Sequence, residues 1–407
     1  MATHFHTTED LVAAVADADF DRPPALVANA HITGLGVARA LTAHDVPVIA
    51  VDRTGDGVAP PSSAVDVAGA VTYPLDDLDG FEDDVAAIAN AVGGEVVAFG
   101  CMDEWVHAFA DVDVSGVTLP FDNHAEVLNK RKLYERAEDL GVPYPETRFL
   151  DETNPEAVVE ELGFPLVLKP FRKREGEEAL GTNVLEVGTA DEFEEVVQTA
   201  EAEEVDLLAQ EKVPIATGKD CSFASYVSPD GPSLGVVGNA TRFPQEFGTS
   251  CLVDTVERPE IRERATRVLE DAGYHGISES EFIYDSDREE YVLLDINTRP
   301  WKWIDLPTTA GANLPMAAYA DVVREENYQS TGTRDARWIY LRDYLHLLTT
   351  DEAFWDVVSR DQWASMISGT FEENPSLTTA VYRPSDPDPT THLVETEFSD
   401  REYYCSC

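Results

Sequence analysis

The sequence predicts a parallel α/β domain followed by an α+β module. Three observations favour this fold class. Apolar strands alternate with helical segments over the first 120 residues, strands and helices are mixed after that, and 43% hydrophobic residues suffice for buried cores. A chain of 407 residues is too long for one core, so two or three packed modules are expected.

The first module opens with a strand, a glycine turn, a helix and a second strand. The segment ALVANAHITGLGVARALTAHDVPVIAVDR places Gly34 and Gly36 before a helical period that ends near His44. A helix around residues 85–92, the strand GEVVAFG and a helix from near Asp103 continue the pattern. GLG resembles part of a dinucleotide fingerprint, but it lacks the third glycine, so a turn that starts a helix explains it better.

The second module mixes helices and strands. A helix with apolar residues at helical spacing stops at Gly141, and another near residues 155–162 precedes the strand FPLVLKP. The segment RKREGEEALGTNVLEV is expected to form a hairpin with an acidic turn, and a helix is expected from Asp191. The strand DLLAQEKVP follows.

The third module begins with the alternating strands CSFASYVS and SLGVVGNATRF. A helix that stops at Gly273 comes next, and two strands joined across DSDRE complete the pattern. Beyond about residue 330 the chain has short amphipathic pieces rich in Trp and Tyr, then a Pro- and Asp-rich end. No internal repeat is present.

The charge balance excludes some partners. The 29 Lys and Arg against 78 Asp and Glu leave a formal charge of −49. Such a field repels phosphate backbones and anionic lipid surfaces, so neither nucleic acid nor membrane is an expected partner. The acids are spread along the whole length, as in a surface adapted to high ionic strength. In this respect the composition resembles that of haloarchaeal proteins, which concerns habitat and not activity.

Cysteines and apolar runs indicate the compartment. The five cysteines are odd in number and scattered, which favours neither a disulfide framework nor a zinc knuckle. The first apolar stretch, LVAAVADADF, is short and acidic, unlike a signal peptide, and no run approaches the ~20 apolar residues that span a bilayer. A soluble, cytoplasmic protein is expected.

Lysines are concentrated in one region. Six of the seven fall between Lys130 and Lys219, which makes them candidates for binding anions, although a solvated cluster would look the same. Lys169 ends the apolar strand FPLVLKP, where a charge is costly without an anionic partner unless the side chain reaches water. The strand LLAQEKVP offers an edge of backbone donors and acceptors to a base.

The hairpin across DSDRE predicts a metal site. Strand alternation places on one face the residues Leu293, Asp295, Asn297 and Arg299. In a symmetric turn Glu281 lies opposite Leu293 and diagonal to Asp295. Two carboxylates and one amide suit magnesium, which leaves its other positions to water and substrate phosphates. An exposed acidic sheet face is the alternative.

Together these segments resemble the ATP-grasp superfamily, in the carboxylate-amine ligase branch that includes D-aspartate ligase-like proteins. The resemblance rests on the ordered series NKRKLYERAEDLGVPYPET, FPLVLKP, LLAQEKVP, GISESEFIYD and LLDINTRPW ending in AGANLP, and it covers roughly residues 24–325. It implies an N-terminal Rossmann-like (pre-ATP-grasp) domain, 1–122; a lid subdomain with its connecting helix, 123–213; a catalytic subdomain, 214–330; and a helical extension and tail, 331–407. ATP would lie between the lid and the catalytic subdomain.

The same resemblance implies residue roles. The phosphates of ATP would contact Lys130 and Lys169, and adenine would lie against Gln210, Glu211, Lys212, Val213 and Leu293. Magnesium, with manganese as the alternative ion, would be held by Glu281, Asp295 and Asn297, and the ribose by Asp220. Arg299 and Arg242 would face the reacting phosphoryl or carboxylate group.

Some positions depart from the family pattern. Asp295 stands where Glu is frequent, which shortens the side chain by one methylene, and Asn129 replaces a frequent Asp. The loop REGEEALGTN is acidic where the family has a glycine-rich flap, so closure over the phosphates would rely on Arg172, Lys173 or Arg174.

The implied reaction joins a carboxylate to an amine through an acyl phosphate, with release of ADP and phosphate. The partners would be two small molecules, and a homodimer is the expected assembly. Phosphoryl transfer to a hydroxyl and non-catalytic ATP binding remain open alternatives. Substrate choice is expected to depend on the HITGLG and GCMDEW segments, Arg242 and Trp301.

Overall fold

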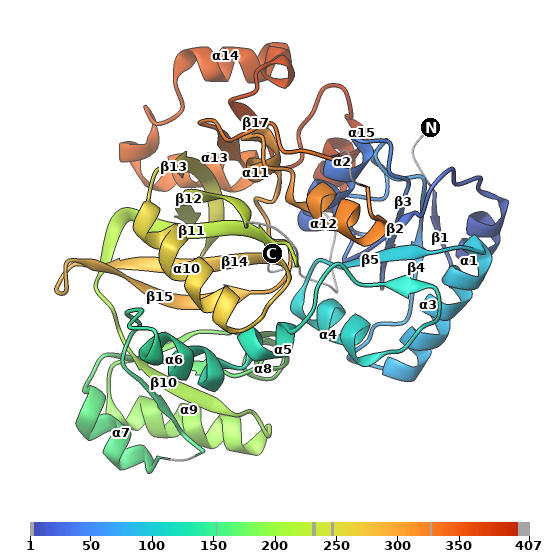
Figure 1. Cartoon of the computed structure of the whole chain (residues 1–407). Coiled ribbons are helices and arrows are strands. Elements are labelled where there is room, and N and C mark those ends of the chain that lie inside the picture. The colour runs from blue at the N-terminus through green and yellow to red at the C-terminus, as the bar shows by residue number, and fades with distance from the viewer. Residues whose placement is uncertain (1–3, 152, 230–232, 246–247, 326–327, 398–407) are drawn as a thin grey trace.

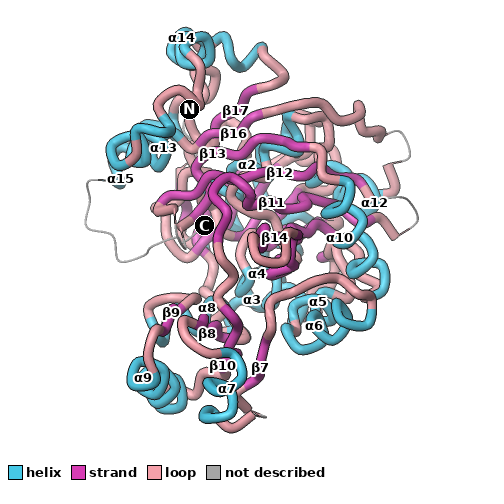
Figure 2. Tube along the Cα trace, turned by 90° about the vertical axis from the view of Figure 1, so that its left-hand side faces the viewer, coloured by secondary structure: helices cyan, strands magenta, loops and turns pink. Residues whose placement is uncertain are grey.

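The computed structural model describes residues 4–151, 153–229, 233–245, 248–325 and 328–397. Three sheets organise the chain: a six-stranded, a four-stranded and a seven-stranded one. Figure 1 shows the N-terminal part (blue to cyan) beside the seven-stranded sheet, and the four-stranded sheet (green) as a lobe of its own below it. The same lobe stands apart in the rotated view of Figure 2.

The N-terminal sheet is entirely parallel, in the order β1-β4-β3-β2-β5-β6. Its strands are β1 (Phe5–His6), β2 (Ala25–Ala28), β3 (Val48–Asp52), β4 (Val67–Ala70), β5 (Val96–Gly100) and β6 (Val117–Thr118). Its helices are α1 (Thr8–Asp17), α2 (Ile32–Thr42), α3 (Leu78–Val92) and α4 (Asp103–Asp111). The predicted strand–helix–strand opening and parallel sheet are confirmed.

Gly34 and Gly36 lie inside α2 and not in a turn before it, so the predicted glycine turn was wrong in detail. Both glycines are required by close approaches. A Cβ on Gly34 would lie 2.2 Å from the Asn29 carbonyl oxygen, and one on Gly36 would lie 2.6 Å from Cγ2 of Ile304. The helix therefore packs directly onto the end of β2 and onto the segment around Ile304.

The lid is an antiparallel sheet in the order β7-β10-β8-β9. Its elements are β7 (Thr147–Phe149), α7 (Pro155–Leu162), β8 (Leu166–Pro170), α8 (Lys173–Leu180), β9 (Leu185–Val187), α9 (Ala190–Ala202) and β10 (Leu207–Glu211). Two helices precede it, α5 (His124–Leu128) and α6 (Lys130–Asp139). Asn129 separates them, and its side chain accepts hydrogen bonds from the first backbone N–H groups of α6.

The hairpin predicted for RKREGEEALGTNVLEV was wrong, because α8 replaces its first strand. The segment consists mainly of Lys, Arg, Glu, Ala and Leu, which are strong helix formers. Gly181 then ends the helix in the left-handed region at φ 75°.

The seven-stranded sheet has the order β15-β14-β11-β12-β13-β16-β17. Its strands are β11 (Ile215–Val227), β12 (Leu234–Phe243), β13 (Thr249–Val256), β14 (Gly276–Asp285), β15 (Glu290–Asn297), β16 (Arg337–Ile339) and β17 (Leu377–Thr379). Helix α10 (Pro259–Asp271) packs against one face through buried apolar residues. The predicted strands β11, β12, β14 and β15 are confirmed, and β13 was not predicted.

The C-terminal segment (residues 331–397) is built into this sheet. Its strand β16 pairs with β13, and β17 runs parallel to β16. The remaining helices are α11 (Asp305–Thr309), α12 (Leu314–Val323), α13 (Leu341–Thr350), α14 (Arg360–Ser368) and α15 (Asp388–Glu397), with short 3-10 turns at Glu352–Phe354 and Thr370–Glu373.

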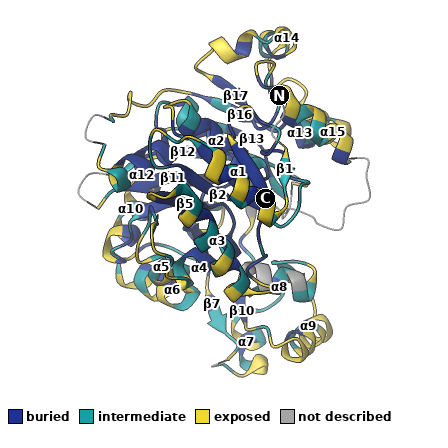
Figure 3. Cartoon of the chain, turned by 90° about the vertical axis from the view of Figure 1, so that its right-hand side faces the viewer, coloured by how far each residue is buried: buried dark blue, intermediate teal, exposed yellow. Residues whose placement is uncertain are grey.

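The main core is continuous between the N-terminal domain and the seven-stranded sheet. One apolar cluster joins α2 and its sheet to α11 and α12, whereas a second one lies under α1, α3 and α4. The lid has its own small core. Figure 3 shows buried strands at the centre and exposed outer faces on α7 and α9. The N-terminal domain and the seven-stranded sheet therefore share one core, whereas the lid packs around a core of its own.

Cys101, Cys221 and Cys251 are buried free thiols, whereas Cys405 and Cys407 lie outside the described residues. In the part of the chain that the structure describes, every helix is too short or too polar to cross a bilayer.

Candidate functional site

A cavity of about 340 Å³ lies between the lid and the seven-stranded sheet. Strands β8 and β10 form one wall, β14 and β15 form the other, and Met102 and Asp103 of the N-terminal domain lie at its edge. Twelve of the thirteen predicted site residues line it: Lys130, Lys169, Gln210, Glu211, Lys212, Val213, Asp220, Arg242, Glu281, Asp295, Asn297 and Arg299. These side chains come from positions up to 169 residues apart in sequence, and the fold brings them together.

The predicted carboxylates are closer than alternation suggested. Glu281 pairs directly with Asp295, because β15 carries one extra residue between the pairs Glu281–Asp295 and Phe282–Leu293. Such a bulge shifts the side-chain alternation on one side of it by one residue. The two acids therefore share a face as neighbours and not as a diagonal pair.

The same bulge makes the prediction for Leu293 wrong. Leu293 is fully buried in the core under α10, on the opposite face from Asp295. Leu294 lines the cavity instead. The prediction assumed that side chains alternate without interruption along the strand. The pattern of apolar residues does not indicate the bulge that interrupts this alternation.

Asn297 completes the polar group on this face. Its amide nitrogen donates to Oε1 of Glu281 at 2.8 Å and to Oε2 of Glu279 at 3.2 Å. Glu279, two residues before Glu281 on the same strand face, was not predicted, although a period of two would have found it. Three carboxylates and an amide thus converge from two adjacent strands.

The donor chemistry of this group fits a hard divalent cation. Among the described residues no three His, Cys, Asp or Glu side chains form a metal site by themselves. Magnesium does not require one, because it is held by one or two carboxylates and completes its shell with water and substrate phosphates. Glu281, Asp295 and Asn297 would supply the protein oxygens.

Two lysines face this group from the lid side. The Lys130 ammonium, at the start of α6, contacts the Asp295 carboxylate. Lys169 on β8 donates to Oε1 of Gln210 at 2.8 Å. Gln210 in turn donates to the hydroxyls of Tyr134 at 3.0 Å and Thr147 at 2.9 Å, which fixes its amide. Both cations are thus positioned toward the cavity by β8, β10 and α6.

The end of β10 forms the predicted base edge. Lys212 pairs with Glu186 at 2.7 Å, and Glu211 accepts from the Glu146 backbone N–H at 2.7 Å. Val213 packs against Ile283 in a small apolar cluster. The side chains of Glu211 and Lys212 are therefore engaged, which leaves the backbone edge and the apolar cluster as the surface suited to a flat ring.

Arg242 lies between two acids at the other side of the cavity. Its guanidinium binds Asp220 through two nitrogens and lies 3.5 Å from Oε2 of Glu281. Burial alone would lower the pKa of Arg242, but Asp220 and Glu281 outweigh burial and raise it. The group stays a cation at all working pH values.

Arg299, two residues after β15, connects the hairpin of β14 and β15 to the N-terminal domain. Its Nε donates to Oδ1 of Asp103, the first residue of α4, at 2.5 Å. Burial lowers the pKa of Arg299, but Asp103 and Glu279 outweigh that effect, so the net shift is upward. Neither Asp103 nor Tyr134 was predicted, and no local signal marks either one.

Three consecutive residues shortly after Arg299, Trp301 to Trp303, also line the cavity. Trp301 and Trp303 are buried and lie edge to face with ring centroids 5.1 Å apart. Lys302 between them is 8% exposed and lines the cavity. Burial lowers the pKa of Lys302, and Asp343 opposes this shift.

Three cations were expected to close over the phosphates. One of them, Arg172, is exposed at the start of α8 and lies outside the cavity lining, so its role stays a prediction. The side chains of Lys173 and Arg174 lie outside the described residues. Glu177 and Asn183 line the cavity from this part of the lid.

Comparison with known proteins identifies the fold. The N5-carboxyaminoimidazole synthetase of Staphylococcus aureus in complex with ADP superposes with a TM-score of 0.61 at 14% identity, covering 83% of this chain and 88% of that one. The biotin carboxylase of Campylobacter jejuni gives 0.60 at 14% identity, over 78% and 74% of the two chains. This chain has the ATP-grasp fold.

The sequence comparison agrees over a short range. The family described as carbamoyl-phosphate synthase L chain, ATP binding domain, matches residues 246–302, which include β14 and β15. No curated protein sequence matches the chain. The ATP-grasp fold with a parallel N-terminal domain, as predicted, is confirmed.

Proposed function

We propose that this protein is an ATP-dependent ligase that joins a carboxylate to an amine through an acyl phosphate. The observation that carries the proposal is the direct pairing of Glu281 with Asp295, with Asn297 beside them, Lys130 in contact with Asp295, and Lys169 lining the same cavity. Cation-binding oxygens and two ammonium groups in one cavity between two sheets support the binding of a triphosphate.

The proposed reaction has two steps. A carboxylate oxygen attacks the γ-phosphorus of ATP, the bond to ADP breaks, and an acyl phosphate forms. An amine nitrogen then attacks the acyl carbon, phosphate leaves, and the nitrogen loses a proton to solvent or to the leaving phosphate. Amide formation is thereby coupled to release of ADP and phosphate.

The protein's contribution is alignment and charge. Lys130 and Lys169 would neutralise phosphate oxygens, and Arg299 and Arg242 would stabilise the oxyanions that develop in each step. Magnesium, when bound, would neutralise the phosphates and align the γ-phosphate. Asp220 would hold Arg242 in position through its two hydrogen bonds.

Similar proteins support the choice of substrates to test. The biotin carboxylase domain of the Hydrogenobacter thermophilus 2-oxoglutarate carboxylase was crystallised with MgADP and bicarbonate, at 18% identity and a TM-score of 0.59. Bicarbonate therefore belongs in the acid panel beside amino acids and simple carboxylic acids. The D-aspartate ligase-like branch remains our proposal, and it places D- and L-aspartate in the panel as well.

The test is a coupled assay of ADP release in molar potassium chloride with pairs of acids and amines. Hydroxylamine trapping accompanies it, since an acyl phosphate yields a hydroxamate and a phosphate ester does not. Asp295→Ala should lower kcat at least about 100-fold. The matched control is Asp287→Ala, an exposed residue at the turn of the same hairpin, which should keep the activity of the parent.

The outcomes of these assays distinguish the ligase from the two alternative functions. ADP release without hydroxamate indicates transfer to a hydroxyl, and ATP binding without ADP release for any pair indicates a non-catalytic protein. Unchanged turnover in Asp295→Ala removes that residue from the site. The expected homodimer stays a prediction for light scattering.

A further inference from the structure

Lys302 is a buried cation to which the proposed reaction gives no role. Its ammonium donates to Oδ2 of Asp343 at 2.7 Å and to the Thr249 hydroxyl at 2.8 Å, and it lies 4.4 Å from the Tyr340 ring centroid. Both Lys302 and Thr249 line the cavity. A lysine buried to this extent is rare unless it is paired or binds a ligand.

The partner of Lys302 comes from outside the ATP-grasp core. Strand β16 of the C-terminal segment adds to β13, and α13 starts two residues later, which brings Asp343 against Lys302. Asp343 is 8% exposed, and Arg342 lies 3.4 Å from its second oxygen. The C-terminal segment therefore supports a residue that lines the cavity, although none of its described residues lines the cavity itself.

Two cations of the corner around Lys302 contact one carboxylate. Lys302 binds Oδ2 of Asp343, and Arg342 lies against Oδ1. Arg242, by contrast, lies between two acids that line the cavity, Asp220 and Glu281. An anionic group on a substrate is attracted to the Lys302 ammonium and repelled from the acids that suit magnesium.

Thr249 gives this corner a second donor. Because its hydroxyl oxygen accepts from Lys302, its own O–H remains to donate toward the cavity that it lines. An ammonium and a hydroxyl side by side match two oxygens of a carboxylate or a phosphate.

We propose that Lys302 and Thr249 bind an oxyanion, a carboxylate or a phosphate, carried by the second substrate, and that Asp343 positions Lys302 for it. The proposal rests on the ligase function and deepens it, because it makes an anionic group on the amine or acid a specificity requirement.

The first test compares substrate pairs that differ only by one carboxylate or one phosphate: aspartate with alanine, succinate with butyrate, and phosphoserine with serine. Lys302→Met should raise KM about 10- to 100-fold for the members that carry the extra anion, with the KM for ATP unchanged. Lys302→Arg, which keeps the charge, should recover part of the loss. Equal effects on both members of each pair would overturn the proposal, since a structural role alone predicts that result.

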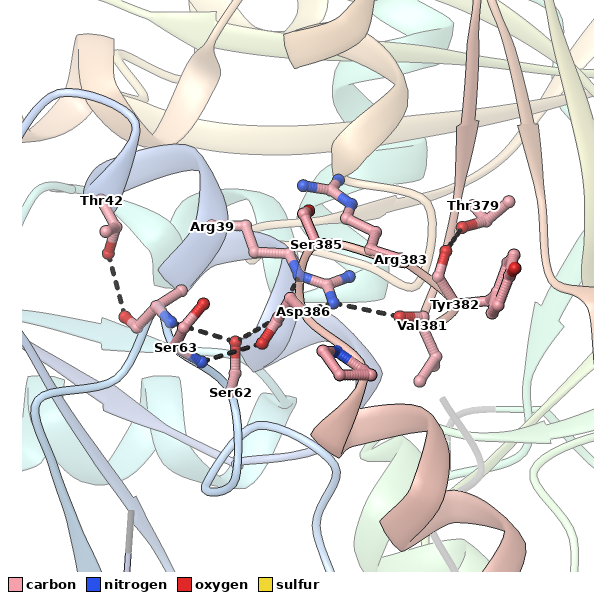
Figure 4. Close-up of polar contacts among 12 residues, drawn as sticks. Arg39, Thr42, Ser62, Ser63, Thr379, Val381, Tyr382, Arg383, Ser385 and Asp386 are labelled. Atoms are coloured by element: carbon pink, nitrogen blue, oxygen red, sulfur yellow. Dashed lines mark hydrogen bonds and ion pairs between the residues drawn. The ribbon is translucent and has the colours of Figure 1, made fainter. Parts of the chain in front are cut away.

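Two variants separate binding from folding. Lys302→Met leaves Asp343 buried without its cation, so Lys302→Met/Asp343→Asn removes both charges and should fold while keeping the raised KM. The control is Asp386→Asn, which loosens a distant anchor of the same C-terminal segment on the N-terminal domain (Figure 4). It should leave the substrate preference unchanged.

The second test does not depend on turnover. Crystals of the full chain soaked in selenate should show an anomalous peak within hydrogen-bond distance of Lys302 and Thr249, and crystals of Lys302→Met should not. A peak with bromide alone, or none with selenate, would overturn the proposal. If the parent releases no ADP with any pair, the ligase function fails, and the selenate result decides this inference by itself.

Discussion

Removing the Asp386 carboxylate should destabilise the whole protein, because it joins the C-terminal segment to the N-terminal domain. Asp386 accepts from Arg39 at 2.9 and 3.2 Å, from the Ser62 hydroxyl at 2.7 Å and from the Ser63 backbone N–H at 2.9 Å (Figure 4). The Arg39 side chain is only 4% exposed. Asp386→Ala therefore leaves a buried guanidinium without its anion.

The magnitude follows from this geometry. Breaking a buried ion pair by removing one partner costs about 3–5 kcal/mol. Arg39 keeps hydrogen bonds to the carbonyls of Ala380 at 3.3 Å and Val381 at 3.0 Å, which favours the lower end of that range. About 3 kcal/mol corresponds to roughly a 100-fold change in the unfolding equilibrium constant.

The assay is guanidinium unfolding in molar potassium chloride, followed by far-UV circular dichroism and tryptophan fluorescence. Glu395→Ala, an exposed change on α15, should stay within about 0.5 kcal/mol of the parent. The pair Arg39→Met with Asp386→Leu should recover most of the loss, since neither charge is then buried alone. A loss below about 1 kcal/mol for Asp386→Ala would refute the reasoning.

Three further changes test other parts of the structure. Lys169→Ala should weaken binding of MgADP about 10- to 100-fold by calorimetry, because a charge-assisted contact to phosphate is lost, and an unchanged Kd would remove Lys169 from the site. Burial raises the pKa of Asp52 to about 6, so the folded protein keeps this proton to higher pH than the unfolded chain. The free energy of unfolding of the parent should therefore fall as pH rises from about 4 to 6, because Asp52 loses its proton in the unfolded chain first. Asp52→Asn carries no such proton, so its free energy of unfolding should rise relative to that of the parent over this range. A difference between the two proteins that does not change with pH would contradict this. Gly36→Ala places a Cβ 2.6 Å from Cγ2 of Ile304 and should cost about 1–3 kcal/mol in denaturant unfolding, whereas Gly94→Ala, with open space around it, should be tolerated. Equal stability of the two glycine variants would show that the interface of α2 adapts.

Local patterns predicted much of the site. The strand FPLVLKP and the hairpin across DSDRE indicated Lys169, Glu281, Asp295 and Asn297, and the resemblance to the ATP-grasp superfamily implied most of the other predicted residues that line the cavity. The local signals are short-range: apolar runs, a period of two, and turn residues. The prediction for Leu293 was wrong because β15 has a one-residue bulge. The position of this bulge depends on how β14 and β15 pair, which the apolar pattern of either strand does not indicate. The hairpin predicted at α8 was wrong because its acidic residues were interpreted as a turn, although the segment has a high helix propensity.

By itself, the sequence determined the fold class, the order of most strands and helices around the cavity, and the types of residue that line it. The tertiary structure alone decided which distant groups meet there: Arg299 with Asp103, 196 residues away, and Lys302 with Asp343 of the C-terminal segment. The physical reason is that periodicity and propensity act over a few residues. Pairing of buried charges depends on how separately formed sheets and helices pack. No local pattern indicates which residues far apart in sequence will meet.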